Sequence, residues 1–139
     1  MNKFFGEILV LIGSIALIFI PLVGGGTIIY ALFNHQLGIL TETSFPLGWG
    51  ALILTVFSHI YCFVYSIYSL RVISLGRSSK KSLFISLPFI IVEIARCVFI
   101  YVNFSSFAFD NMFNILMILT FVFYFIQLCG FILNYKKRI

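Results

Sequence analysis

Four apolar stretches, each about as long as a membrane-spanning helix, follow one another along the chain with short polar segments between them. They cover about residues 4–23, 47–70, 82–102 and 112–135. An α-helix rises 1.5 Å per residue, so about 20 apolar residues cross a hydrocarbon core of roughly 30 Å. The pattern predicts an all-α membrane protein: a bundle of four transmembrane helices that forms a single integral membrane domain over residues 1–139.

The first stretch contains residues that weaken a helix, because Pro removes a backbone donor and Gly adds backbone freedom. Pro21 is followed by Gly24, Gly25 and Gly26, yet apolar residues continue to Phe33. A straight helix from residue 4 to residue 33 would be about 45 Å long, which a bilayer accommodates only with a strong tilt. We therefore expect a kink or break at the glycine triplet, with residues 27–33 at the outer interface. A gating hinge is the alternative interpretation.

Polar or small residues recur at helical spacing inside the stretches, which predicts one inward-facing side on each helix. In the second stretch these residues are Thr55, His59, Cys62, Ser66 and Ser69. In the fourth they are Thr120, Tyr124, Gln127 and Asn134. In the first they are the small residues Gly6, Gly13, Ser14 and Ala16. Small residues at such positions allow close contact between helices.

The third stretch carries two charged residues, Glu93 and Arg96, near its middle. Each costs about 2.5–3.5 kcal/mol on the membrane-insertion scale, while each Leu, Ile, Phe or Val returns roughly 0.3–0.6 kcal/mol. The sum is close to zero, so this helix should need neighbours that supply polar partners. The i, i+3 spacing permits an ion pair between the two residues. His59, Tyr124 and Gln127 lie at similar depth and are candidate second partners.

These five residues form the predicted intramembrane polar network, for which two interpretations remain open. In the first, interhelical hydrogen bonds of about 0.6–2 kcal/mol each select which helix faces meet. In the second, Glu93, His59 and Arg96 line a path for protons or ions, or form a ligand site, because buried ionisable residues in membranes often do so.

The composition supports lipid as the solvent. Hydrophobic residues make up 62% of the 139 residues and charged residues only 9%, and the mean hydropathy is +1.15. A water-soluble domain of this size could not bury so much apolar surface, and no polar segment is long enough to form a separate aqueous domain.

The basic residues predict the orientation. Apart from Arg96, all of them fall in segments on one side of the predicted membrane: Lys3, Arg71, Arg77, Lys80, Lys81, Lys136, Lys137 and Arg138. The opposite loops, residues 34–46 and 103–111, contain no Lys or Arg. By the positive-inside rule, both termini are expected in the cytoplasm. Topology accounts for the net charge of +5, so nucleic-acid binding is not expected.

Residue patterns for catalysis or metal binding are lacking in the sequence. The three cysteines are odd in number and show no CxxC spacing, so neither a disulfide framework nor a metal site is expected. No nucleophile is placed with a base and an orienting group, and the glycine triplet lacks the Lys of a phosphate loop. We therefore expect no enzyme activity, no cofactor and no bound metal.

The functional expectation follows from the basic inner face. Near an anionic leaflet each such charge is worth about 1 kcal/mol, so anionic lipids are expected partners. We expect a non-catalytic membrane subunit, homo-oligomeric through its small and polar faces, that anchors, senses or signals to a cytoplasmic protein. The composition suggests the bacterial cytoplasmic (inner) membrane and an accessory system such as phage defence or toxin immunity. The alternative is a small oligomeric ion channel or proton-linked transporter that uses Glu93, His59 and Arg96.

Overall fold

The computed structural model describes residues 2–33, 45–77, 79–103 and 111–135. These residues form four helices: α1 (Asn2–Phe33), α3 (Phe45–Ser74), α4 (Lys80–Asn103) and α6 (Asn111–Tyr135). Each helix contains a segment that is long and apolar enough to cross a membrane. The segments are Phe4–Gly26, Trp49–Ser74, Lys80–Asn103 and Asn114–Tyr135. The all-helical architecture is thereby confirmed, and each predicted span falls in a helix that is long and apolar enough to cross a membrane. The ends of these apolar segments differ from the predicted ones by at most four residues, although α1 itself continues to Phe33.

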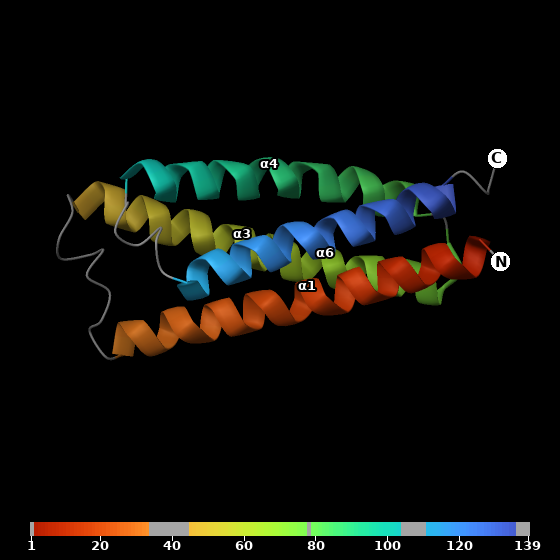
Figure 1. Ribbon diagram of the computed structural model, residues 1–139, viewed down its shortest axis with the longest axis horizontal. Coiled ribbons are helices and arrows are strands. Elements are labelled where there is room, and N and C mark those ends of the chain that lie inside the picture. The colour runs from red at the N-terminus through yellow and green to blue at the C-terminus, as the bar shows by residue number, and fades with distance from the viewer. Residues whose placement is uncertain (1, 34–44, 78, 104–110, 136–139) are drawn as a thin grey trace.

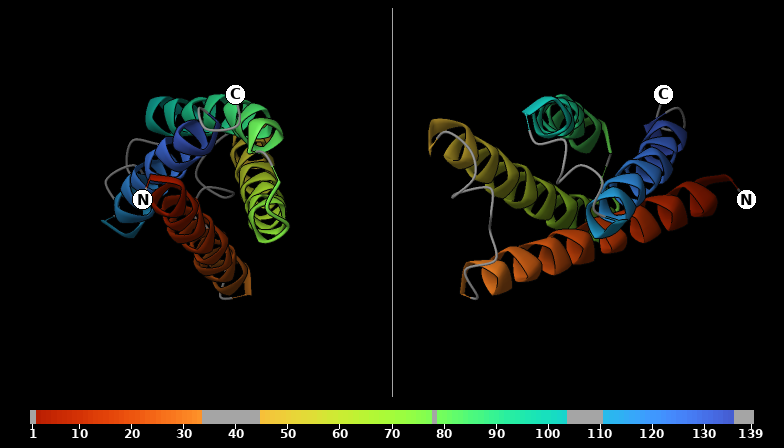
Figure 2. Two further views of the ribbon diagram at one scale, coloured as in Figure 1. Left: turned by 90° about the vertical axis from the view of Figure 1, so that its right-hand side faces the viewer. Right: turned by 60° about the vertical axis from the view of Figure 1, so that its left-hand side comes forward.

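The helices form an antiparallel bundle in which every helix contacts two others (Figure 1). Helix α1 packs against α6 and α3, and α4 packs against α3 and less extensively against α6. Helix α1 begins and α6 ends at the same end of the bundle as the α3–α4 connection (Figure 1). Away from this end, α1 and α3 diverge (Figures 1 and 2).

The end that holds the α3–α4 connection is called the basic end, because it carries Arg71, Arg77, Lys80 and Lys81. Lys80 lies there with its ammonium nitrogen 6.0 Å from the ring centroid of Tyr135, at the end of α6. The tail residues 136–138 and the opposite loops, residues 34–44 and 104–110, lie outside the described part of the chain. The membrane side that the basic end faces stays a prediction.

The predicted break at the glycine triplet is wrong, because α1 is one continuous helix through Pro21 and Gly24 (Figure 1). Both residues lie on its buried side. A Cβ atom on Gly24 would lie 2.5 Å from Nε2 of His59. The glycine thus makes room for a side chain of α3, and packing against neighbouring helices overrides its weak helix propensity. The 32 residues correspond to about 48 Å of helix.

The small-residue face of α1 is confirmed, and it contacts α6. A Cβ atom on Gly13 would lie 2.9 Å from the carbonyl oxygen of Phe123. On the α6 side, a Cβ atom on Gly130 would lie 2.8 Å from the carbonyl oxygen of Gly6. The two backbones therefore approach as closely as small residues permit, as in other tightly packed membrane helices. The glycines of α1 were expected on this face from the sequence, whereas their partner Gly130 was not.

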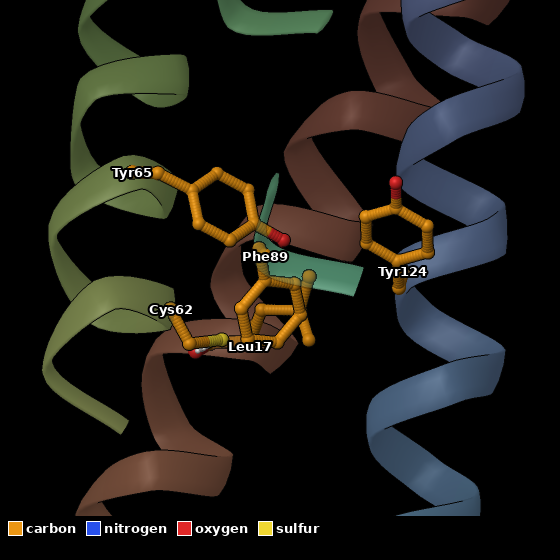
Figure 3. Packing of buried hydrophobic residues seen from close by; sticks show 5 residues of the cluster. All are labelled: Leu17, Cys62, Tyr65, Phe89 and Tyr124. Atoms are coloured by element: carbon orange, nitrogen blue, oxygen red, sulfur yellow. Dashed lines mark hydrogen bonds between the residues drawn. The ribbon is translucent and has the colours of Figure 1, made fainter. Parts of the chain in front are cut away.

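All four helices contribute to one central cluster, formed by Leu17, Cys62, Tyr65, Phe89 and Tyr124 (Figure 3). The rings of Tyr65 and Phe89 are 5.2 Å apart between centroids, and those of Phe89 and Tyr124 are 5.8 Å apart. The Cys62 thiol donates to the carbonyl oxygen of Leu17 at 3.3 Å. This cluster joins the helices midway along the bundle.

The polar residues face inward, as the periodicity predicts. On α4 the buried side chains are Ser82, Ser86, Phe89, Glu93, Arg96, Cys97 and Ile100. The opposite side of α4 is apolar and exposed, with Phe84 at 60% and Ile91 at 68%. Polar groups inside and apolar groups outside are the arrangement that a lipid environment favours.

Candidate functional site

Glu93 and Arg96 form an ion pair one turn apart on α4, with both side chains buried. The Arg96 Nε atom donates to Glu93 Oε2 at 3.0 Å, and Arg96 Nη2 donates to Glu93 Oε1. Two parallel hydrogen bonds of this kind hold a carboxylate in a fixed orientation as well as neutralising it. The predicted pairing of the two residues is therefore present in the structure.

Ser58 of α3 is the second partner of the carboxylate. Its hydroxyl donates to Glu93 Oε2 at 2.5 Å, and the Cys97 thiol approaches Oε1 at 3.9 Å. His59, Tyr124 and Gln127 were the partners expected for this position from the sequence. A signal for Ser58 was present, because it lies four residues before Cys62 and eleven before Ser69, which are both buried. Side chains at these spacings share one helix face.

His59 is only partly buried and is held between its own helix and α1. Its Nδ1 atom donates to the carbonyl oxygen of Thr55 at 2.8 Å, while Nε2 lies against Gly24. The imidazole is within electrostatic reach of Glu93 and Arg96. His59 therefore lies beside the ion pair and secures the contact between α1 and α3.

The other two residues of the predicted network bond to other helices. The Tyr124 hydroxyl donates to the carbonyl oxygen of Ser86 at 3.3 Å and so joins α6 to α4. The Gln127 amide donates to Ser14 Oγ at 2.7 Å and so joins α6 to α1. The five predicted residues are all inside the bundle, but they form separate interhelical links in place of one continuous network.

Several buried polar atoms lack a hydrogen-bond partner within the described residues. In the interior between the ion pair and the basic end they are Tyr65 Oη, Ser66 Oγ, Ser82 Oγ and Gln127 Oε1. The hydroxyl of Tyr65 points toward the space between α3 and α6 (Figure 3). Buried polar groups of this kind are costly unless they bind internal water or a ligand. The interior toward the basic end therefore contains buried polar atoms that the hydrogen bonds among the described residues leave unsatisfied.

A pocket of about 560 Å³ lies at the basic end, within the size range of about 300–1,000 Å³ that is usual for ligand sites. Its lining comes from the last turns of α3, the connection and the first turn of α4. The lining residues are Tyr68, Arg71, Val72, Leu75, Arg77, Lys80 and Lys81. Below, it is called the basic pocket.

A glycine cap shapes one wall of the basic pocket. Gly76 has a φ of +61°, which only glycine adopts without strain. Its amide donates to the carbonyl oxygen of Ile73 at 2.8 Å, and the Arg77 amide donates to that of Val72 at 3.0 Å. These two bonds form a Schellman motif, which ends α3 and satisfies its last carbonyl groups. The motif fixes the backbone position of Arg77.

The electrostatics of the basic pocket favour anions. Four of its seven lining residues are Lys or Arg, and none is Asp or Glu. The first turn of α4, which adjoins the pocket, contains no acidic residue, and a helix N-terminus carries partial positive charge. Four of the eight residues of the predicted basic face thus meet here. The side chain of Lys3 and residues Lys136, Lys137 and Arg138 lie outside the described part.

Within residues 2–33, 45–77, 79–103 and 111–135, no group of three or more His, Cys, Asp or Glu side chains is placed to hold a metal ion. The three cysteines are free; Cys62 and Cys97 are buried and Cys129 is exposed.

Comparison with known proteins gives no relative from which a function can be transferred. No protein-family model matches the chain, and no curated protein and no solved structure matches it either.

Proposed function

We propose that this protein is a non-catalytic, polytopic membrane subunit that anchors, senses or signals to a cytoplasmic partner through its basic inner face. The observation that carries the proposal is the basic pocket, which Arg71, Arg77, Lys80 and Lys81 line and to which no Asp or Glu of the described residues contributes. The buried ion pair supports it indirectly, because Glu93 is already bonded by Arg96 and Ser58 and so acts as an interhelical link.

The chemistry of this face selects the partner. An acidic surface would be steered toward a cluster of cations, and the like-charged surfaces of other proteins would be repelled. A bacterial inner-membrane system such as phage defence or toxin immunity is the proposed setting, on analogy of architecture alone. A homo-oligomer in the membrane would repeat the basic face and increase avidity for such a partner.

Co-purification from native membranes tests this function. We expect the wild-type protein to retain a stoichiometric cytoplasmic protein at low salt and to release it as ionic strength rises. Neutralising Arg71→Gln and Arg77→Gln together should abolish retention. The matched control, Arg71→Lys with Arg77→Lys, keeps the charge and should retain the partner. Recovery of no stoichiometric cytoplasmic protein with the wild type would contradict the proposal.

The second candidate is a small oligomeric ion channel or proton-linked transporter built around Glu93, His59 and Arg96. The observation that favours it is the set of buried polar atoms without partners, Tyr65 Oη, Ser66 Oγ, Ser82 Oγ and Gln127 Oε1. Internal water bound to such groups would extend a polar path from the ion pair toward the basic end.

Flux through proteoliposomes tests the second candidate. Proton or cation flux with the wild type should fall at least tenfold in Glu93→Gln and in His59→Ala. Cys129→Ser changes an exposed residue outside the polar interior and serves as the control with unchanged flux. Absence of flux in the wild type, or equal flux in all variants, would exclude conduction through this cluster.

A further inference from the structure

We infer that the basic pocket binds the phosphate group of an anionic phospholipid, so that one lipid molecule is held at the junction of α3 and α4. The inference deepens the proposed function, on which it rests for placing the basic end at the inner membrane surface. The inferred site binds one lipid at a defined place. General attraction to an anionic leaflet, in contrast, would require only exposed charges.

The charges suit a phosphate. Arg71 and Arg77 offer planar guanidinium groups that bind two phosphate oxygens at once, and Lys81 adds a compact cation. All three belong to the pocket lining. Glu7 and Glu93, the acidic residues of the described ranges, form no ion pair with any of these three cations. The cations therefore face one cavity without a carboxylate from the described residues to neutralise them.

The rest of the lining suits an amphiphile. Tyr68, Val72 and Leu75 form the apolar part of the pocket, and Leu75 is 55% exposed. Beyond the pocket, the outward sides of α3 and α4 stay apolar, with Ile67 at 45% and Phe84 at 60% exposure. A headgroup phosphate can thus lie among the cations while its acyl chains follow these outward faces.

The position of the pocket favours a lipid over a soluble phosphate. One candidate membrane span, Trp49–Ser74, ends at the pocket, and the next, Lys80–Asn103, begins there. A bilayer crossed by these two segments would place the pocket at the level of its headgroups, where anionic lipids would surround it at high local concentration. The phosphate of such a lipid reaches the pocket without leaving the membrane.

The pocket wall is also organised in advance. The Schellman motif at Gly76 holds the backbone of Arg77 through two hydrogen bonds, and Arg71 and Val72 belong to the last turns of α3. A site whose backbone is already ordered loses less conformational entropy on binding.

Native mass spectrometry of the purified full-length protein in detergent tests the inference, with phosphatidylglycerol and phosphatidylcholine as the lipid probes. We expect one phosphatidylglycerol to bind at least tenfold more tightly than phosphatidylcholine. The triple variant Arg71→Gln, Arg77→Gln and Lys81→Gln should lose this preference. The matched control Lys136→Gln, Lys137→Gln and Arg138→Gln removes the same charge from the tail and should keep it.

A second variant tests the same site independently, in case the triple variant does not fold. Leu75→Glu leaves every cation in place and adds a carboxylate at an exposed position of the lining, so it should also abolish the preference. Equal losses in the pocket and tail variants would show general surface attraction and overturn the inference. So would displacement of the lipid by millimolar inorganic phosphate or glycerol 3-phosphate, which would identify a soluble phosphate as the ligand.

The outcome is independent of the docking function, because the purified protein is measured without a cytoplasmic protein. If the protein prefers phosphatidylglycerol but no cytoplasmic protein co-purifies, only the docking proposal is contradicted. If a cytoplasmic protein co-purifies but the protein shows no lipid preference, only the lipid site is contradicted.

Discussion

His59 of α3 lies directly against Gly24 of α1, so close that a side chain on residue 24 would require the imidazole to move. A Cβ atom there would be 2.5 Å from Nε2 of the imidazole, whose Nδ1 donates to Thr55. The contact explains why a glycine stands inside a continuous apolar helix. Gly24 differs in this respect from Gly25 and Gly26, where an added Cβ atom would meet nothing within 4 Å.

Gly24→Ala should therefore destabilise the protein although alanine is the better helix former. The gain in helix propensity is up to about 1 kcal/mol, whereas displacing the imidazole costs about 1–3 kcal/mol as overpacking. Gly25→Ala, with open space around it, is the control and should be neutral or stabilising. Unfolding free energies in a detergent titration would distinguish the two, and equal values would disprove the packing role of Gly24. The double variant Gly24→Ala with His59→Ala should recover much of the loss.

The α1–α6 contact should also be sensitive to a single methyl group, because backbone atoms line it. Gly130→Ala would place a Cβ 2.8 Å from the Gly6 carbonyl oxygen and the Val10 amide nitrogen. Backbone atoms cannot move aside as a flexible side chain can, so we expect a loss of about 1–3 kcal/mol. Gly26→Ala is the control on an exposed helix position. Unchanged thermal stability of the Gly130 variant would mean that the two backbones are less close than described.

The stability of the bundle should fall sharply when only one partner of the buried ion pair is removed. Arg96→Leu leaves Glu93 buried with Ser58 and Cys97 as its remaining donors, and should cost about 3–5 kcal/mol. Replacing both residues by Leu removes the uncompensated charge and should cost far less, or stabilise the bundle. Unfolding titrations of the two variants provide the comparison. If the double variant were the less stable one, the ion pair would be a net source of stability.

Replacing Gly76 by any residue that has a Cβ atom should weaken the cap of α3 and lower the stability of the protein. Gly76→Ala forces alanine into the left-handed region, which costs about 1–2 kcal/mol. Gly76→Asn should cost less, because Asn adopts this region more readily. Thermal unfolding of both variants measures which of them is more stable, and we expect this to be Gly76→Asn. A Gly76→Ala protein as stable as the wild type would show that α3 ends without this cap.

Much of the candidate site was accessible from sequence. The i, i+3 spacing of Glu93 and Arg96 is a property of a single helix, so their pairing could be inferred once the stretch was recognised as helical. The clustering of Arg71, Arg77, Lys80 and Lys81 followed from their closeness along the chain. The partner of the carboxylate was not identified from the sequence. The spacing of Ser58 to Cys62 and Ser69 places it on the inward side of α3, but the adjacent His59 also fits a polar stripe, and the rotation of α3 about its axis selects between them.

The amino-acid sequence alone determined the four long apolar helices, the inward side of each helix and the gathering of the described cations at one end. These features depend on hydropathy, periodicity and charge, which act over distances of a few residues. The tertiary structure decided the continuity of α1 through Gly24, the backbone contact between Gly6 and Gly130, and the shape of the basic pocket. Each of these depends on the distance between residues that are far apart in the chain or on the path of a turn. Packing sets those distances, and no local pattern of residues specifies them.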